Sequence, residues 1–198
     1  MIADSLAGRR IAVTGSTGFL GTALVERLLR SVPDCELVLV VRPGRRGARR
    51  RVDRDILRND AFDRLRDELG TDGFAEMTAQ RVTAVAGDVA VDGLGLDDAG
   101  RAAIAGCDIF IHSAAIVSFD SPLDQAVEVN LLGPVRVASV LTELGVAPHL
   151  VAVSTCYVAG SRRGAAPEEP VDESPFFVGV DWSNEGDSAR QIRRDTET

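Results

Sequence analysis

Short apolar runs alternate with amphipathic segments along most of the chain. Five of these runs have the length of buried parallel strands, and they cover residues 11–13, 36–41, 81–86, 108–112 and 149–154. Between them, apolar residues recur every three to four positions, which is the spacing of one face of a helix. Strands that alternate with helices favour a parallel sheet with right-handed connections. We therefore predict a doubly wound α/β fold with strand order 3-2-1-4-5.

The amphipathic segments predict the helices that connect these strands. One begins near Leu20, and others are expected over residues 48–69, 97–104, 122–132 and 134–144. Asn59 or Asp60 is expected to interrupt the long segment and cap a second one, and Asp97 is expected to cap the next helix. The Gly133-Pro134 pair must kink or split the last two segments, because proline lacks the N–H group of a helix hydrogen bond.

A glycine-rich turn joins the first strand to the first helix, in the order Thr-Gly-Ser-Thr-Gly-Phe-Leu-Gly. At this place Gly15 permits a tight turn, Gly18 lets the backbone approach a pyrophosphate, and Gly21 lets the helix pack close to the strand. The helix N-terminus also offers N–H groups and its dipole to phosphates. Strand, turn and helix together predict a Rossmann-like dinucleotide site. Its candidate cofactor-binding residues are Gly15, Ser16, Thr17, Gly18, Phe19, Leu20 and Gly21.

Length and composition fit one soluble α/β domain. The chain has 198 residues, of which 45% are hydrophobic and 26% charged, as in ordinary globular proteins. No apolar run approaches the roughly 18 residues of a membrane span, and the N-terminus lacks the order of a signal peptide. We expect a cytoplasmic protein without an integral membrane segment. Three distant cysteines and two histidines predict neither a disulfide framework nor a metal centre.

Charge is distributed unevenly along the chain. The net charge of −8 argues against general nucleic-acid binding. All 22 basic residues are arginine, and ten of them fall within residues 42–66 against four aspartates. We expect most of these arginines to form a solvated helix face; the alternative, at the start of the stretch, is an anion site for a phosphorylated ligand. The absence of lysine excludes a Walker phosphate loop, which requires one.

The end of the second strand bears on the choice of cofactor. NAD-specific sites place an acid there for the ribose 2′-hydroxyl, whereas an arginine accommodates a 2′-phosphate. Here the strand is followed by Arg42, with Arg45 and Arg46 close behind. A guanidinium binds phosphate through a two-pronged contact and stays charged at any working pH. We therefore predict NADPH (NADP) as the cofactor, with Arg42 at its 2′-phosphate.

Taken together, these motifs resemble the extended branch of the short-chain dehydrogenase/reductase superfamily. Within it, the chain resembles the male-sterility-type fatty acyl-CoA reductases and the thioester-reductase domains of carboxylic acid reductases. The likeness is carried by TGSTGFLG, by HSAAIVSFD at residues 112–120 and by VSTCYVAG at residues 153–160. Such reductases take hydride from NADPH onto an acyl thioester, giving an aldehyde and in some cases an alcohol. The resemblance thus implies acyl-CoA or another acyl thioester as substrate, and leaves chain length, product and oligomeric state open.

The resemblance also implies roles for individual residues. Thr155 falls at the family's active-site Ser/Thr, whose hydroxyl binds the substrate carbonyl, and Asn130 matches a supporting helix asparagine that bonds main chain. His112 is expected to be a packed structural residue and not a base. Further cofactor-binding residues are Asp88, Val89, Ser113, Ala114 and Ala115. Residues expected to line the substrate channel are Val117, Phe119, Cys156 and Tyr157.

The catalytic pair of the superfamily is not found in this sequence. Hydride transfer to a carbonyl needs an acid to protonate its oxygen, and in this superfamily that acid is the tyrosine of a Tyr-x-x-x-Lys pair. The chain has one tyrosine and no lysine, and Ser161 stands four residues after Tyr157. We expect the NADPH-binding portion of a longer reductase, inactive alone. The alternatives are a non-catalytic NADP-binding redox sensor, and a fragment of a nucleotide-sugar epimerase or dehydratase, which HSAAIVSFD disfavours.

The pattern changes after the fifth strand. From Ser161 onward the chain has turns rich in glycine, proline and acids, and its last sixteen residues are nearly all polar or charged. Neither a sixth strand nor a closing helix is expected there. We therefore expect an NADP-binding domain over residues 1–160. Residues 161–198 would be a partly disordered polar insertion or tail at the start of a substrate-binding part, leaving the sheet incomplete at its C-terminal side.

Overall fold

A computed structural model describes residues 2–155, 163–165 and 179–197, with side chains described as far as Ile192. It contains a five-stranded sheet in which all strands are parallel, in the order β3-β2-β1-β4-β5. The strands are β1 (Arg10–Thr14), β2 (Glu36–Val41), β3 (Val82–Ala86), β4 (Ile109–His112) and β5 (His149–Ala152). This confirms the predicted fold and strand order. Each strand boundary lies within two residues of its predicted place.

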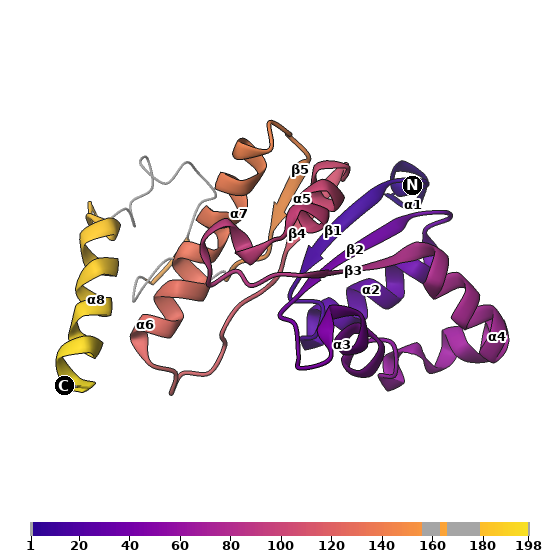
Figure 1. Cartoon of the computed structure of the whole chain (residues 1–198), viewed down its shortest axis with the longest axis horizontal. Helices are drawn as coiled ribbons and strands as arrows, with labels where there is room; N and C mark the ends of the chain where they lie inside the picture. Colours follow the sequence, from indigo (N-terminus) through magenta and orange to yellow (C-terminus); the bar gives the residue numbers. More distant parts are fainter. Residues whose placement is uncertain (1, 156–162, 166–178, 198) are drawn as a thin grey trace.

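Helices cover both faces of the sheet (Figure 1). One face carries α2 (Phe19–Ser31), α3 (Gly47–Asp55) and α4 (Asp63–Arg81). The other face carries α5 (Asp98–Ala105) and α7 (Leu132–Glu143). The remaining elements are α1 (Ile2–Leu6), the short helical turns η1 (Asp60–Phe62) and η2 (Asp92–Gly95), α6 (Leu123–Ala126), the π-helix η3 (Val127–Leu131) and α8 (Trp182–Glu197).

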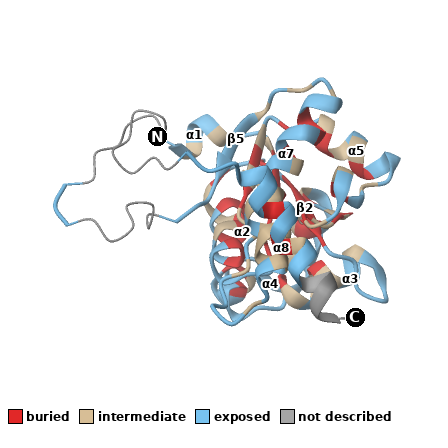
Figure 2. Cartoon of the chain, turned by 90° about the vertical axis from the view of Figure 1, so that its left-hand side faces the viewer, coloured by how far each residue is buried: buried red, intermediate tan, exposed pale blue. Residues whose placement is uncertain are grey.

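Alternate residues of the central strand face the two helical layers. Ile11 and Val13 belong to the apolar cluster formed with α2, α3 and α4, whereas Ala12 belongs to the cluster formed with α5 and α7. All three are completely buried. A strand buried on both faces has no polar positions, which explains why this strand appears in the sequence as a continuous apolar run. Figure 2 shows the buried residues concentrated on the strands and on the inner sides of the helices.

The helix predicted over residues 48–69 is two helices, and the second continues farther. The side chain of Asn59 accepts a hydrogen bond from the N–H group of Ala61 at 2.9 Å and so begins η1, as predicted. α4 then runs to Arg81, twelve residues beyond the predicted end at Leu69. Gly70 interrupts α4 with a φ of 70°, which is why the helical pattern breaks at this point in the sequence.

The predicted break near Pro134 takes the form of a wide turn before the proline. Residues Val127–Leu131 form one π-helical turn between α6 and α7. Pro134 then lies in the first turn of α7, so the N–H group that proline lacks falls directly after the turn in which the hydrogen-bond pattern of the helix changes. A π-helical turn inside a longer helix changes the direction in which its side chains point. Glu128 and Asn130 lie in this turn.

The prediction that no closing helix follows β5 was wrong, because α8 forms over Trp182–Glu197. Its start is capped by Asp181, whose Oδ1 accepts from the N–H groups of Ser183 and Asn184 at 3.2 Å. α8 lies beside α6 (Figure 1), with Ala189 buried. The helix depends on a partner distant in the sequence, which its polar composition did not reveal. The division into residues 1–160 and 161–198 stays a prediction.

Glu128 holds α8 through a small ion-pair network. It accepts hydrogen bonds from Arg190 of α8 at 2.5 Å and from Arg136 of α7 at 2.6 Å. The Glu128 side chain is only 26% exposed, so these contacts are partly shielded from water. The hydrogen bond from Arg190, followed by that from Arg136, lowers the pKa of Glu128 below its ordinary value of 4.5.

We expect Glu128→Gln to loosen α8 and to lower the free energy of unfolding by about 1–3 kcal/mol, because two guanidinium groups lose their charged acceptor. The pH dependence has a defined sign. Since the pKa of Glu128 is lowered on folding, its contribution is full above about pH 4.5 and is lost as the pH falls through the lowered pKa. Amide hydrogen exchange of α8 between pH 3 and pH 7, together with urea unfolding, measures both effects.

Glu143→Gln is the matched control. Glu143 pairs with Arg101 at 3.2 Å, and its side chain is 55% exposed, so its loss should cost roughly 0–1 kcal/mol. Equal protection of α8 in the two variants would contradict the proposed tether.

β5 forms one edge of the sheet, and all four of its residues are exposed. Its neighbour β4 has two buried residues, so burial falls steeply towards this edge. Within the described ranges, no helix is both long enough and apolar enough to cross a bilayer.

Candidate functional site

A cavity of about 220 Å³ opens at the carboxyl ends of the strands. This is the edge at which open parallel sheets bind ligands, at the point where the strand order reverses between β1 and β4. Its walls come from the turn after β1, the end of β2, the turn after β3 and the segment after β4. The lining residues are Thr14–Gly18, Val40–Arg42, Arg51, Gly87–Val89, Ser113–Ile116 and Val129.

The glycine turn leaves no room for side chains at two of its positions. Gly15 has a φ of 73°, and a Cβ added there would lie 2.6 Å from the backbone nitrogen of Ala114. A Cβ at Gly21 would lie 2.7 Å from the Cα of Ser16. Gly18 precedes α2 and supplies no side-chain cap, so the first N–H groups of the helix are not occupied by a capping side chain. The turn is therefore built as an open cradle for an anion.

Ser16 carries a buried hydroxyl that is not satisfied by the described part of the protein. The residue is completely buried, and its Oγ has no hydrogen-bond partner there. A buried hydroxyl without a partner costs free energy, so such an atom beside a cavity indicates a place for a ligand acceptor. Together with the open cradle, this atom fits the phosphates of a dinucleotide, and this fit is independent of the glycine spacing in the sequence.

Thr14 connects β1 to the segment after β4. Its Oγ1 accepts from the N–H groups of Ser113 at 3.2 Å and Ala114 at 3.4 Å, and lies 2.8 Å from Nδ1 of His112. Since the oxygen accepts these bonds, its proton is directed to Nδ1 of His112, which leaves the proton of the neutral ring on Nε2. Burial lowers the pKa of His112, so the imidazole stays neutral. Thr14 thus positions the wall of the cavity at Ser113 and Ala114, with His112 as its partner.

We expect Thr14→Val to lower the free energy of unfolding by about 1–3 kcal/mol, because it leaves the N–H groups of Ser113 and Ala114 and the Nδ1 of His112 without their partner. Thr14→Ser is the matched control, since it keeps the hydroxyl and removes one methyl group at a cost of about 1 kcal/mol. Urea unfolding compares the two. The ¹⁵N shifts of the His112 ring should change only in the valine variant; a change in both would show that the hydroxyl does not set the tautomer.

Arg42 and Arg51 supply the positive charge of this cavity. Arg42 follows β2, is exposed, and forms no ion pair within the described part of the chain. Arg51 comes from α3, and its Nη1 donates to the backbone oxygen of Arg42 at 2.8 Å. Asp88 lies across the cavity, where its Oδ1 accepts from the N–H group of Ala90 at 3.0 Å and keeps the turn after β3 closed.

Asn130 fixes the loop that borders the cavity. Its Oδ1 accepts from the N–H group of Ile116, and its Nδ2 donates to the carbonyl oxygen of Ile116, both at 2.8 Å. This paired contact joins the π-helical turn η3 to the segment after β4. Asn130 therefore acts on the cavity through Ile116, which lines it, and does not line it directly.

The remaining candidates lie outside this cavity. The side chains of Phe19 and Leu20 are exposed at the start of α2, and Val117 and Phe119 are exposed in the loop after β4. Thr155 follows β5 at the same edge of the sheet but does not line the cavity. The last two, Cys156 and Tyr157, lie outside the described residues.

Sequence reasoning missed two polar residues of the cavity. Thr14 was overlooked although a hydroxyl at the carboxyl end of a buried strand, beside the glycine turn, is a usable signal. Arg51 had no such signal, because it is one of ten arginines in its segment and only the fold brings it against Arg42.

Comparison with known proteins identifies the family. The sequence matches the family described as male sterility protein, an NAD-binding family, over residues 13–197. The chain belongs to this family. Fatty acyl-CoA reductase 8 of Arabidopsis thaliana is 36% identical over 169 residues, which are 83% of this chain and 34% of that protein. Fatty acyl-CoA reductase 1 of Xenopus laevis is 28% identical over 90% of this chain and 34% of its own length. The chain thus spans about a third of the length of these curated members of the male sterility family.

Solved structures share the fold of this chain. The terminal R domain from the myxalamid PKS-NRPS biosynthetic pathway is similar with a TM-score of 0.65 and 26% identity, covering 96% of this chain and 46% of that one. The reductase domain of PhqB from Penicillium fellutanum has a TM-score of 0.56 and 20% identity, covering 94% of this chain and 44% of its own, and it supports the fold alone.

Proposed function

We propose that the chain binds NADPH and forms the cofactor-binding part of an acyl thioester reductase, with acyl-CoA as the substrate class. One observation carries the choice of cofactor: Arg42, at the end of β2, lines the same cavity as the glycine turn. Arginine at this point accommodates a 2′-phosphate, which NADH lacks. The substrate class rests on the family and on the names of its similar members, Fatty acyl-CoA reductases of plants and animals.

Different residues of the cavity would contact different parts of the cofactor. Ser16 and the first N–H groups of α2 would hold the pyrophosphate, and Arg42 the 2′-phosphate. The turn at Asp88 and Val89 would face the adenine. Small side chains at Ser113, Ala114 and Ala115 leave room along the wall for the rest of the molecule. When bound, NADPH supplies the hydride that reduces a thioester carbonyl.

Thr155 is our candidate for orienting the substrate, since its hydroxyl could donate a hydrogen bond to the thioester carbonyl oxygen from the carboxyl end of β5. Asn130 supports the site by holding the main chain of Ile116. Protonation of the carbonyl oxygen needs an acid, for which this superfamily uses a tyrosine assisted by lysine. The chain has no lysine, so we expect it to bind NADPH without turning over acyl-CoA by itself.

Calorimetric titration with NADPH and NADH tests the cofactor. We expect NADPH to bind at least tenfold more tightly, because the 2′-phosphate gains a charge-assisted contact worth about 1.5–3 kcal/mol. Similar affinities would reject the assignment of Arg42. NADPH oxidation in the presence of a long-chain acyl-CoA tests the second part: we expect none above background, and multiple turnovers would refute our account of the missing acid.

A further inference from the structure

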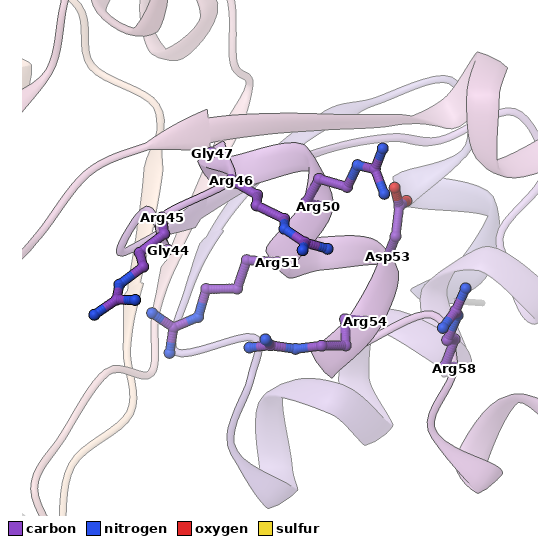
Figure 3. Close-up of a pocket in the computed structure, with 9 residues that line it drawn as sticks. All are labelled: Gly44, Arg45, Arg46, Gly47, Arg50, Arg51, Asp53, Arg54 and Arg58. Atoms are coloured by element: carbon purple, nitrogen blue, oxygen red, sulfur yellow. The ribbon is translucent and has the colours of Figure 1, made fainter.

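A second cavity lies beside the first, along α3 (Figure 3). Its volume is about 450 Å³, and Arg51 lines both cavities, so the two adjoin. The lining residues are Gly44, Arg45, Arg46, Gly47, Arg50, Arg51, Asp53, Arg54 and Arg58. Six of these nine residues are arginines. In Figure 3 the side chains of Arg46, Arg51 and Arg54 extend over the same side of α3, and Arg45 and Arg58 stand at opposite ends of the group.

The acids nearby do not neutralise these arginines. Arg51 and Arg54 share one carboxylate, that of Asp55, with their Nε atoms at 3.4 Å and 2.5 Å from its oxygens. Asp53, the acid in the lining, is paired with Arg49 at 3.0 Å. The other four lining arginines form no ion pair within the described ranges. They are Arg45, Arg46, Arg50 and Arg58.

The fold holds these charges together at a cost. Arg46, Arg50 and Arg54 are spaced four residues apart, from the residue that precedes α3 through the helix, and so share one side of it. Like charges at this spacing destabilise a helix by a few tenths of a kcal/mol per pair. The loop before the helix is closed tightly, with the N–H group of Gly47 donating to the oxygen of Gly44 at 3.0 Å. An anion bound among these guanidinium groups would relieve their repulsion.

We propose that the cavity along α3 is a second anion site that binds a phosphate-bearing group other than the cofactor's own. Guanidinium groups contact phosphate oxygens in pairs, and a hollow of this size matches small-molecule sites. The same phosphate chemistry has two sources, the 3′-phosphorylated nucleotide end of coenzyme A or free inorganic phosphates. The inference stands on the residues of this cavity alone and goes beyond the proposed binding of NADPH.

Calorimetric titration of the chain with inorganic pyrophosphate at low ionic strength tests the site. Measurements are made with and without saturating NADPH, which occupies the first cavity. We expect about one equivalent of pyrophosphate to bind with NADPH present. The Arg50→Ala/Arg58→Ala double variant should weaken this binding at least tenfold and leave the affinity for NADPH unchanged. Arg50 and Arg58 make no ion pair within the described ranges, so the variant should fold normally, which thermal unfolding verifies.

Arg64→Ala is the control, because Arg64 lies on α4, away from the cavity, and pairs there with Glu68. Coenzyme A and 3′-dephospho-coenzyme A then separate the sources. Tighter binding of coenzyme A than of its dephospho form identifies the 3′-phosphate end as the ligand; weaker binding of both coenzymes than of pyrophosphate identifies free phosphates, and both results support the site.

Three results would overturn the proposal. The first is that pyrophosphate does not bind. The second is that NADPH abolishes pyrophosphate binding while the double variant loses affinity for NADPH, which would make the cavity an extension of the cofactor site. The third is that heparin binds and pyrophosphate does not, which would indicate a surface for an acidic macromolecule.

Discussion

Gly15→Ala is expected to lower the free energy of unfolding by about 2–5 kcal/mol. Two costs add at this position. The backbone has a φ of 73°, which costs a residue with a side chain roughly 1–2 kcal/mol. The new Cβ would also meet the backbone of Ser113 and Ala114, and relief of such overpacking typically costs a further 1–3 kcal/mol. Because that backbone lines the cofactor cavity, NADPH binding should weaken as well.

Gly8→Ala separates the two costs. Gly8 has a φ of 66°, close to that of Gly15, but an added Cβ has no atom within 4 Å. Gly8→Ala should therefore lower the free energy of unfolding by the backbone contribution alone, about 1–2 kcal/mol, and keep its affinity for NADPH. Urea unfolding of both variants, with calorimetric titration of NADPH, gives the comparison. Equal destabilisation by Gly15→Ala and Gly8→Ala would show that the backbone of Ser113 and Ala114 moves aside for the new Cβ with no loss of stability.

Arg42→Gln is expected to weaken NADPH binding by roughly 10- to 150-fold, which corresponds to the loss of about 1.5–3 kcal/mol of charge-assisted hydrogen bonding. Binding of NADH should change little, because NADH has no 2′-phosphate for the guanidinium to contact. The variant should therefore bind NADPH and NADH with nearly equal affinity. Glutamine keeps most of the side-chain length and removes the charge, so packing changes are small.

Arg64→Gln is the matched control for this substitution. Arg64 is exposed on α4 and pairs with Glu68 at 2.8 Å, remote from the cavity. It should leave both affinities unchanged at fixed ionic strength. A loss of NADH affinity in Arg42→Gln equal to that of NADPH would show that Arg42 shapes the loop instead of contacting the 2′-phosphate. Arg51, which donates to the backbone of Arg42, would then be the next candidate.

The sheet could be predicted because the residues that indicate each strand lie within or next to that strand in the sequence. Strands buried on both faces, such as β1 and β2, are continuous apolar runs, and the glycine turn stands at a fixed place between β1 and α2. The start of η1 at Asn59 and the cap of α5 at Asp97 depend on side chains that accept from N–H groups only two or three residues away. Signals of this range are visible in one sequence.

The features that escaped prediction depend on contacts between distant residues. α8 is held by Arg190 against Glu128, which is 62 residues away, so its polar sequence suggested no helix. The place of Arg51 in the cavity follows from the packing of α3 against β2 and β3 and not from its neighbours. Thr155 lies three residues after the end of β5, and the sequence could not show that the cavity is formed by the segments after β1, β2, β3 and β4.

The π-helical turn η3 contacts two separate parts of the molecule. Glu128 reaches α8, and Asn130, two residues later, holds Ile116 at the border of the cavity. One turn of backbone thus holds both α8, at the periphery, and the loop after β4 that borders the cavity. Equilibrium coupling between two such contacts is reciprocal. A ligand that orders Ile116 would also favour the docked position of α8, and α8 in turn would hold the site ready for its ligand.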